Sequence, residues 1–181
     1  YTERFGLTGA VISAVNLVNG IGICAGLEVI HCPGATGYLD TDYEGKVRAA
    51  LAALERHDFV YLHVEAPDET SHEGKLDLKI QAIEDFDARV VTPVLEFAAA
   101  RKDCRVLVAP DHITALSTKT HAAGPVPFAM YGAGIQPNGA TQYSEVAAAQ
   151  TGVLIRRGHA LVPYFLRSPH ITAQAIKVID Q

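Results

Sequence analysis

The sequence is poor in residues that mark several classes of protein. Its three cysteines, Cys24, Cys32 and Cys104, are widely spaced and form no Cys-x-x-Cys pair, so neither a disulfide framework nor a thiolate zinc site is indicated. We expect each to act as a small buried apolar residue in a reducing compartment. No apolar run is long enough to cross a bilayer and no signal peptide is visible, so we expect a cytoplasmic protein.

Basic residues are not clustered, and acidic residues outnumber them by 20 to 15, which gives a net charge of −5. A nucleic-acid groove or an anionic membrane surface is therefore not expected as a partner. Apolar residues make up 49% of the chain and charged residues 19%, with a mean hydropathy of +0.13, which excludes intrinsic disorder. A chain of 181 residues buries roughly 70% of its unfolded surface and needs no disulfide or metal to fold.

The chain begins at Tyr1 without an initiator methionine, and its one methionine is Met130. We expect a piece cut from a longer protein, and a processed mature chain is the alternative.

Hydrophobic periodicity predicts alternating strands and helices. The predicted strands are residues 9–15, 27–32, 59–65, 105–109 and 126–131, and the predicted helices are residues 16–25, 44–57, 76–101, 144–149 and 158–166. Asn16 and Ser144 are expected to cap their helices, and Pro93 is expected to kink the longest one or to mark a break in it. This alternation predicts an α/β sandwich with a mostly parallel sheet flanked by helices, and the sequence shows no domain boundary, repeat or linker.

Acidic and imidazole side chains follow two of the predicted strands. Asp68 and His72 lie in a predicted loop after one strand, and Asp111 and His112 come directly after another. The segment between residues 110 and 125 has no helical pattern, so we expect the next strand to return antiparallel and to hold His121 at the same sheet edge. Ligands in open α/β sheets collect at such edges, so these five groups are expected to converge.

Carboxylate and imidazole ligands from separate loops suit zinc or manganese, and two such sets suit a two-metal site for phosphoryl transfer. A bland interpretation stays open. One Asp-x-x-x-His match arises readily by chance, and an aspartate after a strand is often only a helix cap. The occurrence of both motifs at consecutive strand ends, with a third histidine, favours the metal site.

Three motifs carry a resemblance to a known family. They are Asp68-Glu69-Thr70-Ser71-His72-Glu73-Gly74, Asp111-His112, and His121 ahead of Pro125-Val126-Pro127-Phe128. They resemble the C-terminal metal motifs of the alkaline phosphatase superfamily, and most closely those of the archaeal type of cofactor-independent (2,3-bisphosphoglycerate-independent) phosphoglycerate mutases. Residues 9–15, 33–38, 58–68 and 79–87 support it, so the resemblance covers nearly the whole chain. It implies an alkaline-phosphatase-like sandwich, present in residues 1–181 as a partial domain.

The resemblance also implies an enzyme, a glycolytic isomerase that interconverts 3-phosphoglycerate and 2-phosphoglycerate. Two divalent metal ions, manganese or zinc, would lie beside a serine that takes the phosphoryl group and returns it to the other hydroxyl. By motif, Asp68, His72 and His121 would hold one metal, and Asp111 and His112 would belong to the other. Lys119 lies between the motifs and is expected to neutralise phosphate charge on a phosphorylated small-molecule substrate.

The sequence departs from the family's pattern in one respect. No stretch before Asp68 resembles the family's N-terminal metal-binding aspartate, its nucleophile segment or its cap domain. Ser13, Ser71 and Ser117 stand in no nucleophile-like context. We therefore expect the C-terminal half of a longer enzyme, inactive by itself. Two alternatives stay open: another phosphatase or phosphotransferase of the superfamily, such as one labelled homoserine kinase, and a non-catalytic α/β fragment.

Four further features have both a functional and a structural interpretation. His63 and Glu65 precede Asp68 and either orient ligands or are hydrogen-bonded structure. The turn-rich loop 33–38 either binds phosphate through its N–H groups or is a plain loop. Lys46 either contacts an anion or is a solvated helix-surface residue.

Overall fold

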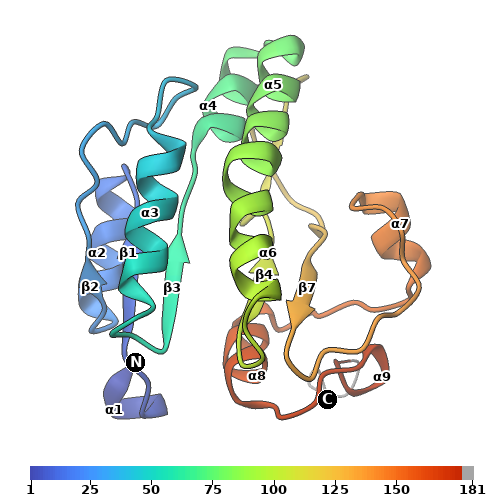
Figure 1. Cartoon of the computed structure of the whole chain (residues 1–181). Helices are drawn as coiled ribbons and strands as arrows, with labels where there is room; N and C mark the ends of the chain where they lie inside the picture. The colour runs from blue at the N-terminus through green and yellow to red at the C-terminus, as the bar shows by residue number, and fades with distance from the viewer. Residues whose placement is uncertain (177–181) are drawn as a thin grey trace. The chain divides into compact units, whose positions relative to one another are not determined.

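The computed structural model describes residues 1–176, which divide into two compact units (Figure 1). Unit 1 comprises Tyr1–Val94 and Thr114–Thr120. Unit 2 comprises Leu95–Ile113 and the residues from His121 onward. The chain passes from unit 1 to unit 2 within a helix, and it returns to unit 1 and leaves it again within a β-hairpin.

Unit 1 is built on a parallel sheet of three strands in the order β2-β1-β3. The strands are β1 (Gly9–Ile12), β2 (Glu28–Val29) and β3 (Phe59–Leu62), and the helices before and between them are α1 (Thr2–Phe5), α2 (Asn16–Cys24) and α3 (Tyr43–Ala53). The first crossover runs from the central strand β1 to β2, and the second runs in the opposite direction from β2 past β1 to β3, so right-handed connections place α2 and α3 on opposite faces. The predicted α/β class with a parallel sheet is confirmed.

The central strand is buried because glycine lets its neighbours approach closely. Ala10, Val11 and Ile12 are almost fully buried. A Cβ at Gly22 of α2 would lie 2.5 Å from Cγ1 of Val11, so any larger residue there would push the helix off the strand. The absence of a side chain at this position therefore sets the distance between α2 and β1.

Helix α3 carries the core of unit 1. Its N-cap is Asp42, whose carboxylate accepts the Gly45 N–H at 2.8 Å. Tyr43, Val47 and Val90 form the buried cluster, with partly buried Leu51, Leu62, Val64, Phe86 and Val94 packed against it. Burial of these apolar side chains is the main stabilising contribution to the unit.

A helical arm follows the sheet. It comprises α4 (Ala66–Glu73), α5 (Leu76–Phe86), a π-helical turn (Asp87–Val91) and α6 (Thr92–Ala99), with α4 and α5 packed side by side (Figure 1). The kink or break expected at Pro93 is a π-helical turn just before this proline, and the helix continues through Pro93 as α6. Proline cannot donate to the preceding turn, and the Thr92 N–H instead donates to the Asp87 carbonyl.

The prediction of a loop between the strand 59–65 and the long helix is wrong, because residues 66–73 form α4. Pro67 lies in the first turn, where its missing N–H costs nothing, and Gly74 ends the helix with φ of 73°. The buried face of α4 is made of Ala66, Thr70 and Ser71, which are too small and polar to give a hydrophobic period.

Unit 2 has a two-stranded sheet and a second apolar core. Strand β4 (Arg105–Val108) pairs antiparallel with β7 (Ala129–Gly132), which confirms the predicted antiparallel return. The core cluster is Phe165, Ile171 and Ile176. The helices are α7 (Glu145–Gln150), a 3₁₀ turn (Gly158–Ala160), α8 (Leu161–Arg167) and α9 (Ala173–Ile176). Ser144 caps α7 as predicted, accepting the Ala147 N–H at 3.2 Å.

The segment 110–125, predicted to lack a helix, contains a hairpin that was not predicted. Its strands are β5 (Ile113–Ala115) and β6 (Thr120–Ala122), joined by a four-residue turn. The strands have three residues each, too few for a period of two to be recognised in the sequence.

Two local predictions are wrong. Asn16 is the first residue of α2, and Val15 holds the cap position without a side-chain hydrogen bond. Cys24 is exposed, whereas Cys32 and Cys104 are partly buried, and all three are free thiols. Within residues 1–176, no helix is both long and apolar enough to cross a membrane.

A bidentate ion pair joins α3 to the π-helical turn and gives unit 1 an acid-sensitive contact. Arg89 donates to Glu44 at 2.7 and 2.9 Å, and its guanidinium lies 4.5 Å from the centroid of the Tyr43 ring. The hydrogen bonds from Arg89 lower the pKa of Glu44 to about 2, from an ordinary value of 4.5.

We therefore predict that Glu44→Gln makes unit 1 less sensitive to acid. A lowered carboxylate pKa contributes stability that is present above about pH 4.5 and is lost as the pH falls toward 2. The urea midpoint of the wild-type chain should fall more steeply between pH 5 and pH 2 than that of the variant, because in this range unfolding lets Glu44 take up a proton that the folded chain does not bind. Glu84→Gln, on the exposed side of α5, is the control, and parallel curves for wild type and Glu44→Gln would contradict the prediction.

Unit 2 depends on Arg105, whose guanidinium joins three segments. It donates to the carbonyls of Ala133 at 2.6 Å, Phe165 at 2.8 Å and Pro169 at 3.2 Å. Arg105→Met keeps the apolar stem and removes the three donors, so the free energy of unfolding of unit 2 should fall by about 2–4 kcal/mol. Hydrogen exchange of the unit 2 amides measures this change. The exposed Lys102→Met should leave exchange unchanged, and an equal effect of both variants would refute the role of Arg105.

Candidate metal centre

Helix α4 places Asp68 and His72 on one face. Strand β3 leads into α4, with Asp68 in its first turn and His72 in its last, four residues apart. Residues at this spacing are neighbours on a helix surface. The Oδ2 atom of Asp68 lies 3.2 Å from Nε2 of His72, and both side chains are partly buried. The first predicted ligand pair is therefore brought together.

Each member of this pair is held by a second group through its other polar atom. The Thr114 hydroxyl donates to Oδ1 of Asp68. The Lys119 carbonyl lies 2.9 Å from Nδ1 of His72, and a carbonyl only accepts, so Nδ1 carries the hydrogen. Thr114 is buried, and its own carbonyl accepts from the Lys79 ammonium at 2.9 Å. The segment from Thr114 to Lys119 therefore orients both candidate ligands.

The same contacts set the electrostatics of His72. The hydrogen bond to the Lys119 carbonyl and the negative charges of Asp68 and Glu69 raise the pKa of His72 above its ordinary value of 6.5. Carboxylate oxygens of Glu65, Asp68 and Glu69 all lie within 4.8 Å of one another. The environment of the pair therefore favours positive charge.

Unit 2 brings the other three predicted ligands together. Asp111 accepts the backbone N–H of His112 at 3.0 Å, and its Oδ2 lies 3.4 Å from Nε2 of the same histidine. The rings of His112 and His121 contact each other in a tilted arrangement, with centroids 3.8 Å apart and an interplanar angle of 35°. Asp111 and His121 are exposed, and His112 is partly buried. The two histidines lie at either side of the β5–β6 hairpin, which positions them as neighbours.

The residues present fit a divalent metal ion. Two ligands bound to one tetrahedral metal at about 2.0–2.2 Å lie about 3.4 Å apart. The separation between Asp68 Oδ2 and His72 Nε2 is 3.2 Å, close to this value. Carboxylate and imidazole donors without thiolates suit zinc or manganese.

Lys119 adopts a left-handed backbone conformation with φ of 55°. Its side chain lies against Gly74, where a Cβ would be only 2.5 Å from Cε of the lysine. The ammonium group is thus held near the end of α4, and its contact with a phosphorylated substrate stays a prediction.

His63 and Glu65, which the sequence allowed to be either ligand-orienting or structural residues, lie in a polar cluster at the carboxyl ends of β1 and β3. Nδ1 of His63 lies 3.0 Å from the Ser13 hydroxyl and 3.5 Å from Oε2 of Glu65. The Ser13 hydroxyl also accepts the Val15 N–H at 3.0 Å. The Ser13 hydroxyl and the Glu65 carboxylate both lie near Nδ1 of His63. A relay that activates a serine needs the serine at one imidazole nitrogen and the carboxylate at the other, so this cluster is not such a relay.

Lys46 is not a solvated helix-surface residue. It is fully buried, with its ammonium 3.5 Å from the Thr36 carbonyl and 3.4 Å from the His63 carbonyl, and burial lowers its pKa. In the loop 33–38, the N–H groups of Ala35, Thr36 and Tyr38 donate to the Cys32 carbonyl, the Thr41 hydroxyl and the Thr36 hydroxyl, respectively. These three groups are therefore structural.

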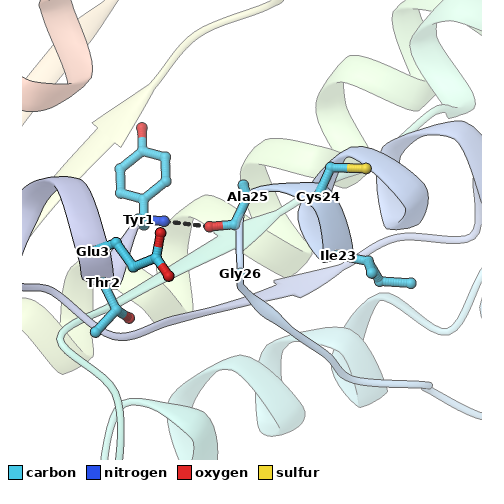
Figure 2. Close-up of a pocket in the computed structure, with 7 residues that line it drawn as sticks. All are labelled: Tyr1, Thr2, Glu3, Ile23, Cys24, Ala25 and Gly26. Atoms are coloured by element: carbon cyan, nitrogen blue, oxygen red, sulfur yellow. Dashed lines mark hydrogen bonds between the residues drawn. The ribbon is translucent and has the colours of Figure 1, made fainter.

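A surface pocket in unit 1 is unrelated to these ligands. Figure 2 shows its lining, in which the N-terminal amine donates to the Ala25 carbonyl. The lining residues are Tyr1, Thr2, Glu3, Ile23, Cys24, Ala25 and Gly26. None of the predicted ligands is among them.

Comparison with known proteins assigns the family. The family model described as the metalloenzyme superfamily matches residues 1–164. The chain therefore belongs to the metalloenzyme superfamily.

Relatives of known sequence specify the relationship further. A probable 2,3-bisphosphoglycerate-independent phosphoglycerate mutase from Geobacter sulfurreducens is 54% identical over 92% of this chain and 42% of its own length. A 2,3-bisphosphoglycerate-independent phosphoglycerate mutase from Methanothrix thermoacetophila is 48% identical over 90% of this chain and 42% of its own length. These relatives confirm the resemblance that the motifs predicted. The chain spans less than half the length of either relative.

Solved structures agree on the fold. The PH0037 protein from Pyrococcus horikoshii superposes with a TM-score of 0.85 and 28% identity, over 94% of this chain and 52% of that one. The cofactor-independent phosphoglycerate mutase from Thermoplasma acidophilum superposes with a TM-score of 0.61 and 24% identity, over 82% of this chain and 33% of that one. The second likeness is evidence for the fold alone.

Sequence reasoning missed Thr114, the residue that orients Asp68. The available signal was its place two residues after His112, in a segment without helical pattern. A threonine there has no distinctive chemistry of its own, so only its hydrogen bond reveals its role.

We predict that Gly74→Ala disturbs the connection between α4 and Lys119. Gly74 has a φ of 73°, and an added Cβ would lie 2.5 Å from Cε of Lys119. The free energy of unfolding should fall by about 1–2 kcal/mol, measured by urea titration. Gly20→Ala in α2 is the control, since a Cβ there meets nothing within 4 Å and should stabilise the helix by up to about 1 kcal/mol. A neutral Gly74→Ala would contradict the expected strain.

Proposed function

We propose that this chain supplies most of the metal ligands of a two-metal phosphoryl-transfer enzyme that interconverts 3-phosphoglycerate and 2-phosphoglycerate through a phosphoserine. The observation that carries the proposal is the Asp68–His72 pair, held 3.2 Å apart with its other atoms already bonded. Membership of the metalloenzyme superfamily and the names of the relatives support it. The reaction would belong to glycolysis and take place in the cytoplasm.

Asp68, His72 and His121 would hold one divalent ion, and Asp111 and His112 would contribute to the second. This grouping rests on the motifs of the family, and connectivity relates the two sets of ligands. His112 precedes Thr114 by two residues, and His121 follows Lys119 by two residues. The hairpin that orients Asp68 and His72 through Thr114 and Lys119 therefore continues directly into the other candidate ligands.

When bound, manganese or zinc ions would neutralise the phosphate oxygens and stabilise the charge that develops during transfer. Hydrogen bonds within this chain orient the ligand atoms of that site. Oδ1 of Asp68 is occupied by the Thr114 hydroxyl, which leaves Oδ2 to face the ion. Nδ1 of His72 is protonated, which leaves Nε2 as the ligand atom. The Lys119 ammonium would add positive charge toward the phosphorylated substrate. The nucleophilic serine is proposed to lie outside residues 1–181, because Ser13 and Ser71 are hydrogen-bonded within unit 1.

We predict that Mn²⁺ or Zn²⁺ raises the thermal unfolding temperature of this chain by several degrees and that EDTA reverses the rise. A ligand that binds only the folded state contributes about 2.7 kcal/mol at a concentration of 100 times its Kd. Asp68→Asn and His72→Gln should each abolish most of the shift, and His170→Gln should keep it. A wild-type chain whose melting curve ignores both metals would favour the non-catalytic alternative.

Turnover is tested in the intact protein that carries this chain. Asp68→Ala or His121→Ala should abolish mutase activity and metal content together, because each removes a ligand. Unchanged turnover in either variant would reject these assignments. A panel of phosphate esters that includes 3-phosphoglycerate distinguishes a mutase from a phosphatase or another phosphotransferase built on the same ligands.

A further inference from the structure

Lys119 is the one non-glycine residue with positive φ among residues 1–176. Left-handed backbone is unfavourable for a residue with a Cβ, and glycine or asparagine is the usual choice. In this conformation both backbone polar groups of Lys119 make hydrogen bonds. The Lys119 N–H donates to the Ala115 carbonyl at 2.7 Å and closes the β5–β6 turn, while the Lys119 carbonyl accepts from Nδ1 of His72 at 2.9 Å.

A second contact supports this conformation. The lysine side chain packs on Gly74, the left-handed residue that ends α4 two positions after His72. Two left-handed residues, one from the turn and one from the helix end, therefore contact each other. The lysine stem contacts the very helix end that carries His72.

We propose that Lys119 is a positioning residue whose left-handed backbone fixes the tautomer of His72. The inference rests on the proposed role of His72 as a metal ligand. A neutral imidazole carries its proton on either nitrogen, and the hydrogen bond made by one nitrogen decides which one is left to bind a metal. The Lys119 carbonyl holds a proton on Nδ1, so that Nε2, which lies 3.2 Å from Oδ2 of Asp68, is the nitrogen left to bind a metal.

The role of Lys119 is then distinct from the charge of its ammonium group. If the turn relaxed to negative φ, the carbonyl would point elsewhere and His72 would lose its acceptor. The proton would then distribute between the two nitrogens, and a metal would have to displace it from Nε2. Loss of a group that bonds to a metal-ligating histidine typically lowers metal affinity 10- to 100-fold.

The test is a graded series at position 119, namely Lys119→Gly, Lys119→Asn, Lys119→Ala and Lys119→Val, in order of falling tolerance for positive φ. The first measurement is the tautomer of His72 in the metal-free chain, read from imidazole ¹⁵N shifts at alkaline pH and assigned by the signal that His72→Gln removes. We expect the Nδ1–H form in wild type, Lys119→Gly and Lys119→Asn, and a mixture in Lys119→Ala and Lys119→Val.

The second measurement is the Kd for Zn²⁺ or Mn²⁺ by titration calorimetry. It should stay within a few-fold of wild type for Lys119→Gly and rise about 10- to 100-fold for Lys119→Val. Thr118→Val, one residue earlier in the same turn, is the control for a β-branched residue at negative φ. Should Lys119→Val fail to fold, the comparison of Lys119→Gly with Lys119→Ala decides.

The two measurements separate this inference from the proposed function. A tautomer that stays on Nδ1 throughout the series would overturn the positioning role, whatever the metal affinities. A Kd that rises equally in Lys119→Gly and Lys119→Val would also overturn it, because the effect would follow the lost ammonium group. A tautomer series that follows φ in a chain that binds no metal would support the positioning of His72 and contradict the proposed function.

Discussion

The opposition of Asp68 and His72 across one turn of α4 is the constraint on which the candidate centre depends. A carboxylate and an imidazole 3.2 Å apart face each other with the two atoms that would bind a cation. Helix geometry alone brings them to the same face. It does not fix the carboxylate torsion or the imidazole tautomer, and those come from Thr114 and Lys119. The helix therefore supplies proximity, and the hairpin turn supplies orientation.

The rest of unit 1 holds that helix in place. β3 is paired with the central strand, and its chain continues directly into α4, so the first turn of α4 is anchored to the sheet. The buried Lys46 bonds to the His63 carbonyl between β3 and α4, and Lys79 of α5 bonds to the Thr114 carbonyl. Buried polar groups of this kind are stable only when they are hydrogen-bonded. Each of these two lysines fixes a backbone segment that carries or orients a ligand.

The sequence predicted the larger features because they rest on burial. The strand–helix alternation of unit 1 follows from apolar period, and the antiparallel return of β7 follows from the lack of a helical period in the segment before it. The π-helical turn before Pro93 follows from proline chemistry. It failed where small or polar residues make the structure. Helix α4 buries Ala66, Thr70 and Ser71, which show no hydrophobic period, and the three-residue strands of the hairpin are too short to show one. Lys46, expected on a helix surface, is buried because two carbonyls receive its ammonium.

The ligand types were predictable for a different reason from the groups that orient them. Aspartate and histidine at strand ends are typical metal ligands, and the resemblance to a family specified which of them would bind each metal. Thr114 and Lys119 have no such mark, since one acts through a hydroxyl and the other through a backbone carbonyl in a turn. A carbonyl is present at every position, so its usefulness depends on φ and ψ and not on residue type.

Lysine at φ of 55° is an unfavourable choice for a turn considered alone. It becomes intelligible when the turn is considered with α4, because the same residue packs its stem on Gly74 and turns its carbonyl to His72. Local conformational preference is overridden here by a contact between two segments 47 residues apart, a separation at which sequence patterns carry no signal.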